Sequence, residues 1–180
     1  KAEVAKSAVP KSAEFILSEE HSDMRYLERP ILAVLRSKNE EYFKSLPDIT
    51  EGLDRLLYNS LKKAAGLKEL FSLLQTKRYP LARLRRLVMS AFLGIDNSFF
   101  LKLPPYLRIL GIGKLNEPLL KSHDCPVLSK ISDIKNFDER SKKIFDLECT
   151  AADLYGLSFK NPLLCGSEYK TPLYKGEKNG

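Results

Sequence analysis

The chain has 180 residues, of which 43% are hydrophobic and 29% are charged. This balance is that of a globular protein rather than of a disordered tail. The length fits one domain with a sizeable core or two small lobes, and we expect one compact unit with an appendage. The net charge of +7 favours a polyanionic partner without identifying it.

Several classes of protein are disfavoured at this stage. The longest apolar stretch, residues 87–95, is far shorter than the roughly 20 residues that span a bilayer. The N-terminus shows no export signal, so we expect a cytoplasmic protein with no membrane partner. The chain starts at Lys1 without an initiator methionine, from which we expect a fragment of a longer protein.

The cysteines and histidines point away from disulfide and metal chemistry. The three cysteines are widely spaced and form no CxxC pair, which predicts buried, reduced thiols. The cluster His123-Asp124-Cys125 matches no usual ligand spacing, and His21 lies far from it in the sequence. We therefore expect no metal ion.

The first part of the chain alternates helical patterns with short breaks. A short helix is predicted over residues 12–18, and Ser22-Asp23 is expected to cap a second helix. The apolar positions of that second helix are Met24, Leu27, Ile31 and Leu35. Pro30 fits there only near the helix start or at a kink. A polar helix over 39–44 then ends at Leu46-Pro47-Asp48.

Three further helices are predicted before residue 95. Thr50 is expected to cap a helix that Gly66 ends, and a second helix follows over residues 67–75. After a basic turn, Pro80 is suited to begin a helix over residues 81–93. Helices joined by such short loops indicate an α bundle.

The pattern changes after Gly94. Residues 106–112 and 126–131 have the composition of buried strands, with a helix predicted between them over 115–121. This order predicts a βαβ-like unit with a parallel sheet. A long helix over residues 138–157 is expected to pack against the unit.

The predicted fold is therefore mainly α with a small α/β lobe: a helical bundle followed by a βαβ-like unit and a packing helix. Residues 1–12 are interpreted as a linker, and residues 13–95 as the helical bundle with its basic helix. Residues 96–158 form the predicted lobe, and residues 159–180 a tail that wraps the surface.

The most informative segment is TKRYPLARLRRLVMSAFLGI, residues 76–95. On a helical wheel the apolar positions Leu81, Leu84, Val88, Ala91, Phe92 and Ile95 share one face. Arg83 and Arg86 lie opposite, and no acidic residue occurs between Glu69 and Asp96. Like charges without local neutralisation repel one another, and the arginine fork matches phosphate geometry. Tyr79 is placed either to stack on an unpaired base or to anchor the turn.

Other interpretations stay open for this segment. Its arginines would need no ligand if they paired with Glu51, Asp54 or Glu148, or if they met an acidic protein surface. A complete small enzyme is a weaker alternative, because the sequence contains no GxxxxGK[ST], GxSxG, HxGH or HExxH motif. We therefore expect no catalytic residue and no bound cofactor in this chain.

Several blocks in order resemble one family. They are Glu51-Gly52-Leu53 with Arg55, TKRYPLARLRRLVMSAFLGI, PPYLRILGI, AADLYGL and SEYKTPLY. Together they resemble the C-terminal half of the tRNA(Met) cytidine acetate ligases, from about residue 50 to residue 174.

The resemblance implies an ATP-dependent parent enzyme that acetylates the wobble cytidine of elongator tRNA(Met) to N4-acetylcytidine. It implies that the nucleotidyltransferase-like catalytic half, with its HxGH-type motif and its ATP, is absent from this chain. By the same resemblance, residues 1–12 are the tail of that preceding catalytic domain or a linker. It also implies two partners, tRNA and the protein's own N-terminal catalytic domain. The positions that match the family's basic block, and so the expected RNA-binding residues, are Lys77, Arg78, Tyr79, Arg83 and Arg86.

Overall fold

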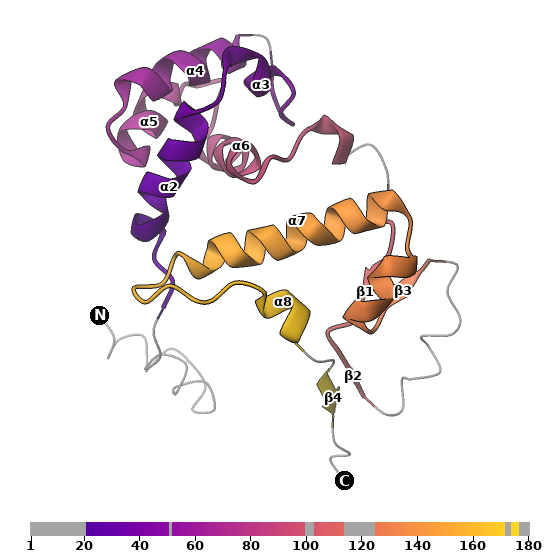
Figure 1. The fold of residues 1–180 in the computed structure, drawn as a ribbon. Coiled ribbons are helices and arrows are strands. Elements are labelled where there is room, and N and C mark those ends of the chain that lie inside the picture. Colours follow the sequence, from indigo (N-terminus) through magenta and orange to yellow (C-terminus); the bar gives the residue numbers. More distant parts are fainter. Residues whose placement is uncertain (1–20, 51, 100–102, 114–124, 172–173, 177–180) are drawn as a thin grey trace.

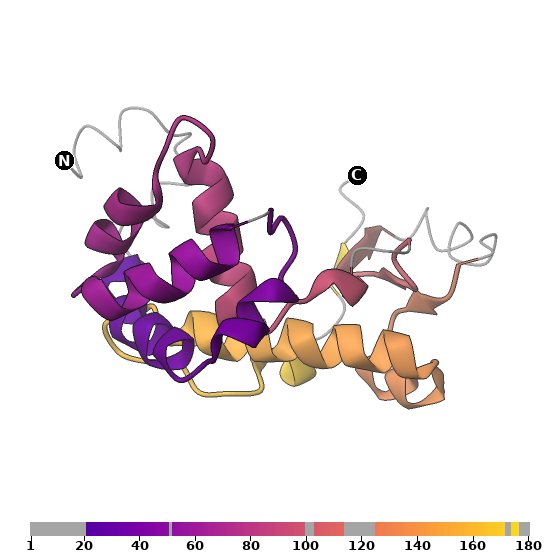
Figure 2. The ribbon, with the colours of Figure 1, turned by 90° about the horizontal axis from the view of Figure 1, so that it is seen from above.

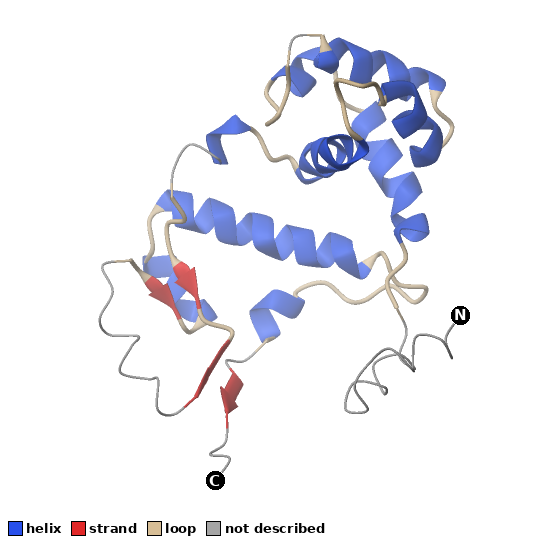
Figure 3. Ribbon diagram, turned by 180° about the vertical axis from the view of Figure 1, so that it is seen from behind, coloured by secondary structure: helices blue, strands red, loops and turns tan. Residues whose placement is uncertain are grey.

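The computed structural model describes residues 21–50, 52–99, 103–113, 125–171 and 174–176. Five helices, α2 to α6, gather at one end of the molecule, and the long helix α7 runs beneath them toward a lobe with short strands (Figure 1). Figure 2 shows the same arrangement from above, and in Figure 3 the described strands lie only in the lobe. The described part of the chain is thus mostly helical, as predicted. The predicted helix over 12–18 lies outside the described residues.

Helix α2 spans Met24–Arg36 and begins where the sequence predicts. The Asp23 side chain accepts a hydrogen bond of 2.8 Å from the backbone N–H of Arg25, which satisfies one of the free donors at the helix start. Its buried residues are Leu27, Ile31, Leu32 and Leu35. Met24, predicted to share that apolar face, is instead 52% exposed. Pro30 lies inside the helix and not near its start, so one backbone donor is missing there.

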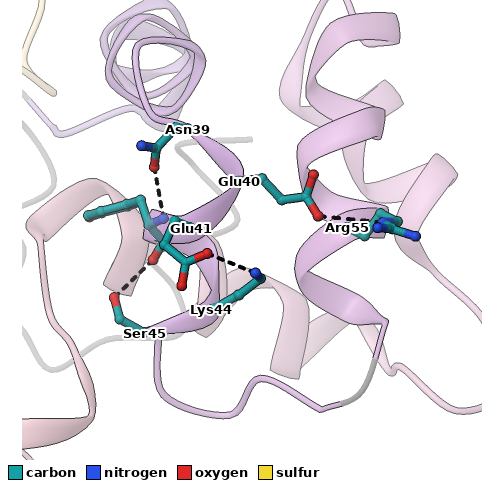
Figure 4. Close-up of polar contacts among 7 residues, drawn as sticks. Asn39, Glu40, Glu41, Lys44, Ser45 and Arg55 are labelled. Carbon is teal, nitrogen blue, oxygen red and sulfur yellow. Dashed lines mark hydrogen bonds and ion pairs between the residues drawn. The ribbon is translucent and has the colours of Figure 1, made fainter.

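Helix α3, Glu40–Lys44, confirms the predicted polar helix. The Asn39 side chain accepts a hydrogen bond of 3.0 Å from the Tyr42 backbone N–H, and the Ser45 hydroxyl closes the other end on the Tyr42 carbonyl (Figure 4). In the same view, Arg55 of α4 reaches Glu40 at 3.4 Å, which links α3 to α4. The chain then leaves α3 through Asp48, whose backbone has the left-handed φ of 62°.

Two predicted helix signals act differently in the structure. Helix α4 spans Leu53–Lys63, and the residue at its N-cap position is Gly52, with a φ of +83°, not the predicted Thr50. The backbone carbonyl of Thr50 accepts a hydrogen bond from the Leu53 N–H, while the Thr50 hydroxyl donates to the Tyr79 hydroxyl. Ala64, not Gly66, ends α4. Gly66 begins α5, Leu67–Leu74, where an added Cβ would lie 2.6 Å from a carboxylate oxygen of Glu28. The φ of −146° at Gly66 is open to any residue, and a movement of the flexible Glu28 side chain would relieve this contact, so the structure does not require glycine here.

Helix α6 spans Leu81–Leu93, as predicted. Pro80 precedes it with a φ of −68°, and Gly94 ends it in the left-handed region with a φ of +74°. The side chain of Asp96 then accepts from the Ser98 backbone N–H at 2.8 Å and caps a single turn, η2, over Asn97–Phe99. The segment from Pro80 to Phe99 therefore follows its sequence signals closely.

The lobe holds two short parallel pairings. Strand β1, Leu107–Arg108, pairs with β3, Val127–Leu128, and β2, Gly111–Gly113, pairs with β4, Tyr174–Gly176. The parallel pairing predicted for the two strands is confirmed by β1 and β3. The predicted strand 106–112 is nevertheless two strands, because the chain changes partner after the Ile109 N–H bonds to the Leu128 carbonyl.

Three other predictions for this region have mixed outcomes. The predicted strand 126–131 ends early, because Ile131–Asn136 forms a 3₁₀ helix, η4. The predicted helix over 115–121 lies outside the described residues. Helix α7, Glu139–Gly156, confirms the predicted long helix, and Asp138 caps it by accepting from the Ser141 N–H at 2.7 Å. The tail forms the short helix α8, Ser167–Lys170, before β4.

The buried apolar residues form two clusters. The larger lies among α2 to α6, and the smaller consists of Tyr106, Leu128, Phe145 and Cys149. Helix α7 contributes to both, since Leu154 packs against the larger cluster while Phe145 and Cys149 belong to the smaller. The two clusters lie on either side of the predicted boundary at residue 95, but the boundaries themselves stay predictions. No helix in the described part of the chain is long and apolar enough to cross a membrane.

Candidate nucleic-acid interface

Helix α6 is anchored by the face that the sequence assigns to the core. Leu84, Val88 and Phe92 are buried, as predicted from the helical wheel. Leu87, which was not predicted to be buried, is buried as well, because it lies one helical turn from both Leu84 and Ala91. Helices α2, α5 and α7 all contact α6, so the helix is covered over more than one face.

The cations of this segment lie in the turn before α6 and on the first two turns of the helix, where Arg85 lines the groove between α2, α5 and α6. We call this set of cations the basic surface, and it consists of Lys77, Arg78, Arg83, Arg85 and Arg86. Arg83 is half-buried and the other four are exposed. The first turn of α6 contains no acidic residue, and no side chain caps its backbone N–H groups. The positive end of the helix dipole therefore adds to the charge of the arginines instead of being offset.

Asp48 provides the nearest carboxylate to the basic surface. Its Oδ2 atom lies 3.8 Å from an Nη atom of Arg86, whose side chain is 66% exposed. Its backbone carbonyl accepts a hydrogen bond of 2.5 Å from Arg83. Within the described residues, no carboxylate lies within ion-pair distance of Lys77, Arg78, Arg83 or Arg85. The surface thus keeps most of its positive charge, as expected from the sequence.

The alternative partners named from the sequence do not neutralise this surface among the residues described. Glu148 is engaged by Arg108 at 3.4 Å, and Asp54 forms no ion pair with the basic surface. Glu51 lies outside the described residues. An exposed pair such as Arg86 with Asp48 contributes at most about 1 kcal/mol, because water screens it.

The Tyr79 ring is buried and is therefore not available for stacking on RNA bases. The side chain is only 7% exposed and belongs to the larger core cluster. The Thr50 hydroxyl donates to the Tyr79 hydroxyl at 3.4 Å, and the Tyr79 backbone N–H donates to the Thr76 hydroxyl at 3.2 Å. The structure therefore supports the second of the two sequence interpretations, in which Tyr79 anchors the turn.

A second charged cluster, in the lobe, carries no signal in the sequence. Arg108 contacts Glu148 of α7 and Glu168 of α8, and its side chain is 18% exposed. Burial alone opposes the charge on Arg108, but the hydrogen bond and charge of Glu168, together with Glu148, raise the pKa of the guanidinium. Because three distant segments supply this cluster, sequence spacing does not predict it. Its charges are paired with one another, so the cluster connects β1, α7 and α8 and leaves no free charge for a ligand.

The cysteines differ in their surroundings. Cys149 is buried, and burial raises the pKa of its thiol, which keeps it protonated and unreactive. Cys165 is exposed and Cys125 half-buried, so the prediction of buried thiols is right only for Cys149. No group of three potential metal-ligating side chains occurs among the residues that the structure describes.

The fold and the basic surface define a helical domain with a small α/β lobe and an open cationic face, and comparisons with known proteins give its family. A family model described as HIGH Nucleotidyl Transferase matches residues 1–168. The chain therefore belongs to this nucleotidyltransferase family. The match starts at residue 1, so the expectation that the chain is a C-terminal half without a catalytic half stays a prediction.

Similar curated proteins are tRNA(Met) cytidine acetate ligases. The one from a Thermoanaerobacter species is 31% identical over 134 residues, which is 71% of this chain and 33% of the relative. The one from Clostridium acetobutylicum is 34% identical over 135 residues, which is 69% of this chain and 32% of the relative. The resemblance seen in the sequence is thus confirmed at the level of the family. The chain spans about a third of the length of these relatives.

Solved structures share the fold. A crystal structure of Thermotoga maritima TmcAL (apo, form I) matches with a TM-score of 0.73 and 20% identity, over 84% of this chain and 41% of that one. A second crystal structure of the same protein, bound with alpha-thio ATP, also matches with a TM-score of 0.73, over 84% of this chain and 42% of that one.

Proposed function

We propose that this chain is a tRNA-binding part of an ATP-dependent ligase that acetylates the wobble cytidine of elongator tRNA(Met). The observation that carries the proposal is the basic surface, on which Asp48 is the one described carboxylate within 4 Å. The names of the similar curated proteins support tRNA(Met) as the ligand. Lys77, Arg78, Arg83 and Arg86 would contact phosphates, in a protein that works in the cytoplasm where tRNA is found.

The test is the salt dependence of binding between the 180-residue chain and a tRNA(Met) transcript. Each phosphate contact releases condensed counterions, so affinity falls as salt rises. Replacing Arg78 and Arg86 together by alanine should reduce the log–log slope by roughly 1.5, at about 0.7 to 0.9 per lost contact. Both side chains are exposed, so the fold should tolerate their removal.

The matched control replaces Arg55 and Lys142 by alanine. Both are ion-paired cations outside the basic surface, and the control removes the same number of charges. It should change the slope by less than half as much as the test variant. Equal losses in the two variants would mean that net charge alone drives binding, and an unchanged slope in the test variant would refute the proposal.

We also propose that the adenylation chemistry of the ligase is supplied by residues other than these 180, with the chain docked against that catalytic domain. The chain contains two histidines, His21 and His123, so no HxGH motif is present within it. Calorimetry of the 180-residue chain with ATP should then give no binding heat. Micromolar binding, or exchange of pyrophosphate into ATP, would contradict this part of the proposal.

A second candidate is an interdomain or protein-binding module, and one observation favours it. A groove of about 730 Å³ between α2, α5 and α6 is lined mainly by apolar side chains, including Met24, Phe71, Leu81 and Met89. Such a surface fits a protein segment better than a phosphate backbone. The salt titration separates the two candidates, because this one predicts no difference in tRNA affinity between the test variant and its control.

A further inference from the structure

Two arginines of the basic surface share one aromatic ring. The guanidinium carbon of Arg78 lies 5.5 Å from the centroid of the Tyr79 ring, and that of Arg83 lies 5.6 Å from it. Both distances fall within the range of about 6 Å in which a cation is attracted to an aromatic face. Arg78 directly precedes Tyr79 in the sequence, whereas Arg83 lies beyond Pro80 and reaches the ring because the turn leads into α6.

The ring is itself fixed from several directions. The Tyr79 backbone is tied to Thr76, its hydroxyl is approached by Thr50 from the loop before α4, and its side chain is part of the larger core. Arg83 is further restrained by its hydrogen bond to the Asp48 carbonyl. A buried, immobile ring therefore supports two side chains that are otherwise among the most flexible in proteins.

An arginine that is already ordered loses less conformational freedom when it binds a phosphate. The ring thus contributes to affinity without adding charge and without reaching the ligand. We infer that Tyr79 is a positioning residue, which holds Arg78 and Arg83 in a fixed orientation for two phosphates of an RNA backbone. This inference rests on the proposed function and replaces the role of Tyr79 as a stacking platform for bases.

The first experiment compares Tyr79→Leu with Tyr79→Phe in binding to a tRNA(Met) transcript. Leucine keeps an apolar side chain but has no aromatic face, whereas phenylalanine keeps the ring and loses only the hydroxyl. Tyr79→Leu should weaken binding about five-fold, because without the ring the two arginines lose more conformational freedom when they bind phosphates. Tyr79→Phe should stay within about two-fold of the wild type. The salt slope should be unchanged in both, because every cation remains.

The second experiment introduces Tyr79→Leu into the Arg78→Ala/Arg83→Ala background. If Tyr79 acts through these arginines, the leucine substitution has no further effect there. A persisting five-fold loss would instead show direct contact between the ring and RNA and would overturn the inference. If the double arginine variant binds tRNA as well as the wild type, the proposed function fails. Loss of binding in that variant with none in Tyr79→Leu overturns the positioning role alone.

A third measurement needs no RNA. In the wild-type chain, the Nε–H protons of Arg78 and Arg83 should show shifted NMR resonances from the ring current of Tyr79. Tyr79→Phe should keep the shifts and Tyr79→Leu should remove them, with thermal unfolding monitored alongside to confirm that each variant is folded. Resonances at ordinary arginine positions in the wild type would overturn the inference.

Discussion

The helical bundle and the lobe are stabilised by different interactions. Among the described residues, 19 buried side chains form the core of the bundle and four form that of the lobe. The bundle can therefore leave its arginines facing water, since apolar burial supplies its stability. The lobe, with its small core, adds a cluster in which Arg108 contacts two carboxylates.

The same residue type has opposite surroundings in the two regions. Arg86 is 66% exposed and lies 3.8 Å from one carboxylate, whereas Arg108 is 18% exposed and lies between two. An exposed arginine without a close partner is available to a ligand, but a half-enclosed and paired one is occupied by the fold. Local partners, more than the number of arginines, separate a binding surface from a structural contact.

The largest effect is expected from the core of the bundle. Leu57→Ala removes a fully buried side chain of α4 and should lower the free energy of unfolding by about 2–5 kcal/mol, through lost burial and the cavity left behind. Urea denaturation measures this change. Leu73→Ala is the control, because Leu73 lies on the neighbouring helix and is exposed, so its cost should stay below about 0.5 kcal/mol. Similar costs for both would show that the bundle core does not dominate stability.

The next effect concerns the charged cluster of the lobe. Arg108→Ala leaves Glu148 and Glu168 close together without their shared cation, and it should destabilise the chain by about 1–3 kcal/mol. Arg86→Ala, measured in the same way, should cost less than about 0.5 kcal/mol. An equal cost for the two substitutions would remove the distinction between a structural and a free arginine.

A pH dependence is expected from Tyr106 in the lobe. Its side chain is buried, and burial, followed by the nearby Glu148 carboxylate, raises the pKa of its phenol. In the unfolded chain the phenol ionises near pH 10, before the folded one does, so the free energy of unfolding should fall as pH rises above about 10. Tyr106→Phe should reduce this fall without abolishing it, because burial also raises the pKa of Tyr42. An identical fall in the variant would contradict the assignment.

The smallest effect is expected at Asp48. Asp48→Asn removes the carboxylate beside Arg86, and asparagine tolerates the left-handed φ of 62° at this position. Affinity for a tRNA(Met) transcript should rise about two-fold at low salt, in keeping with the small energy of an exposed ion pair. Asp146→Asn on α7 removes the same charge far along the sequence and serves as the control. A gain of the same size there would reflect net charge alone.

Much of the helical framework was predictable because its signals are local. Asp23 caps α2 as predicted, Asn39 and Asp138 cap helices whose starts were predicted at these positions, and Gly94 ends α6. Each of these residues acts on backbone groups within a few positions of itself, so its role follows from sequence alone. The exposed cations of the basic surface were also predictable, because no acidic residue lies near them in the chain.

The parts that the sequence did not predict depend on contacts between distant segments. Tyr79 is buried in a core built from five helices, and its hydroxyl accepts a hydrogen bond from Thr50 in the loop before α4. Gly66 was interpreted as a helix stop, but α4 already ends at Ala64 and Gly66 directly precedes α5, so it lies in the short connection between the helices. The cluster of Arg108 joins three elements that lie far apart in the sequence.

Helix α7 contributes side chains to both cores, and this has a mechanical consequence. Its 18 residues extend about 27 Å at a rise of about 1.5 Å each. Leu154, near one end of the helix, packs against the core of the bundle, and Phe145, nearer the other end, packs in the core of the lobe. The helix is therefore a rigid connection between the two cores. Because α7 also contacts α6, a displacement of the lobe would move α6 and its arginines with it. The backbone amides of α7 should therefore exchange with deuterated water as slowly as those of the bundle core.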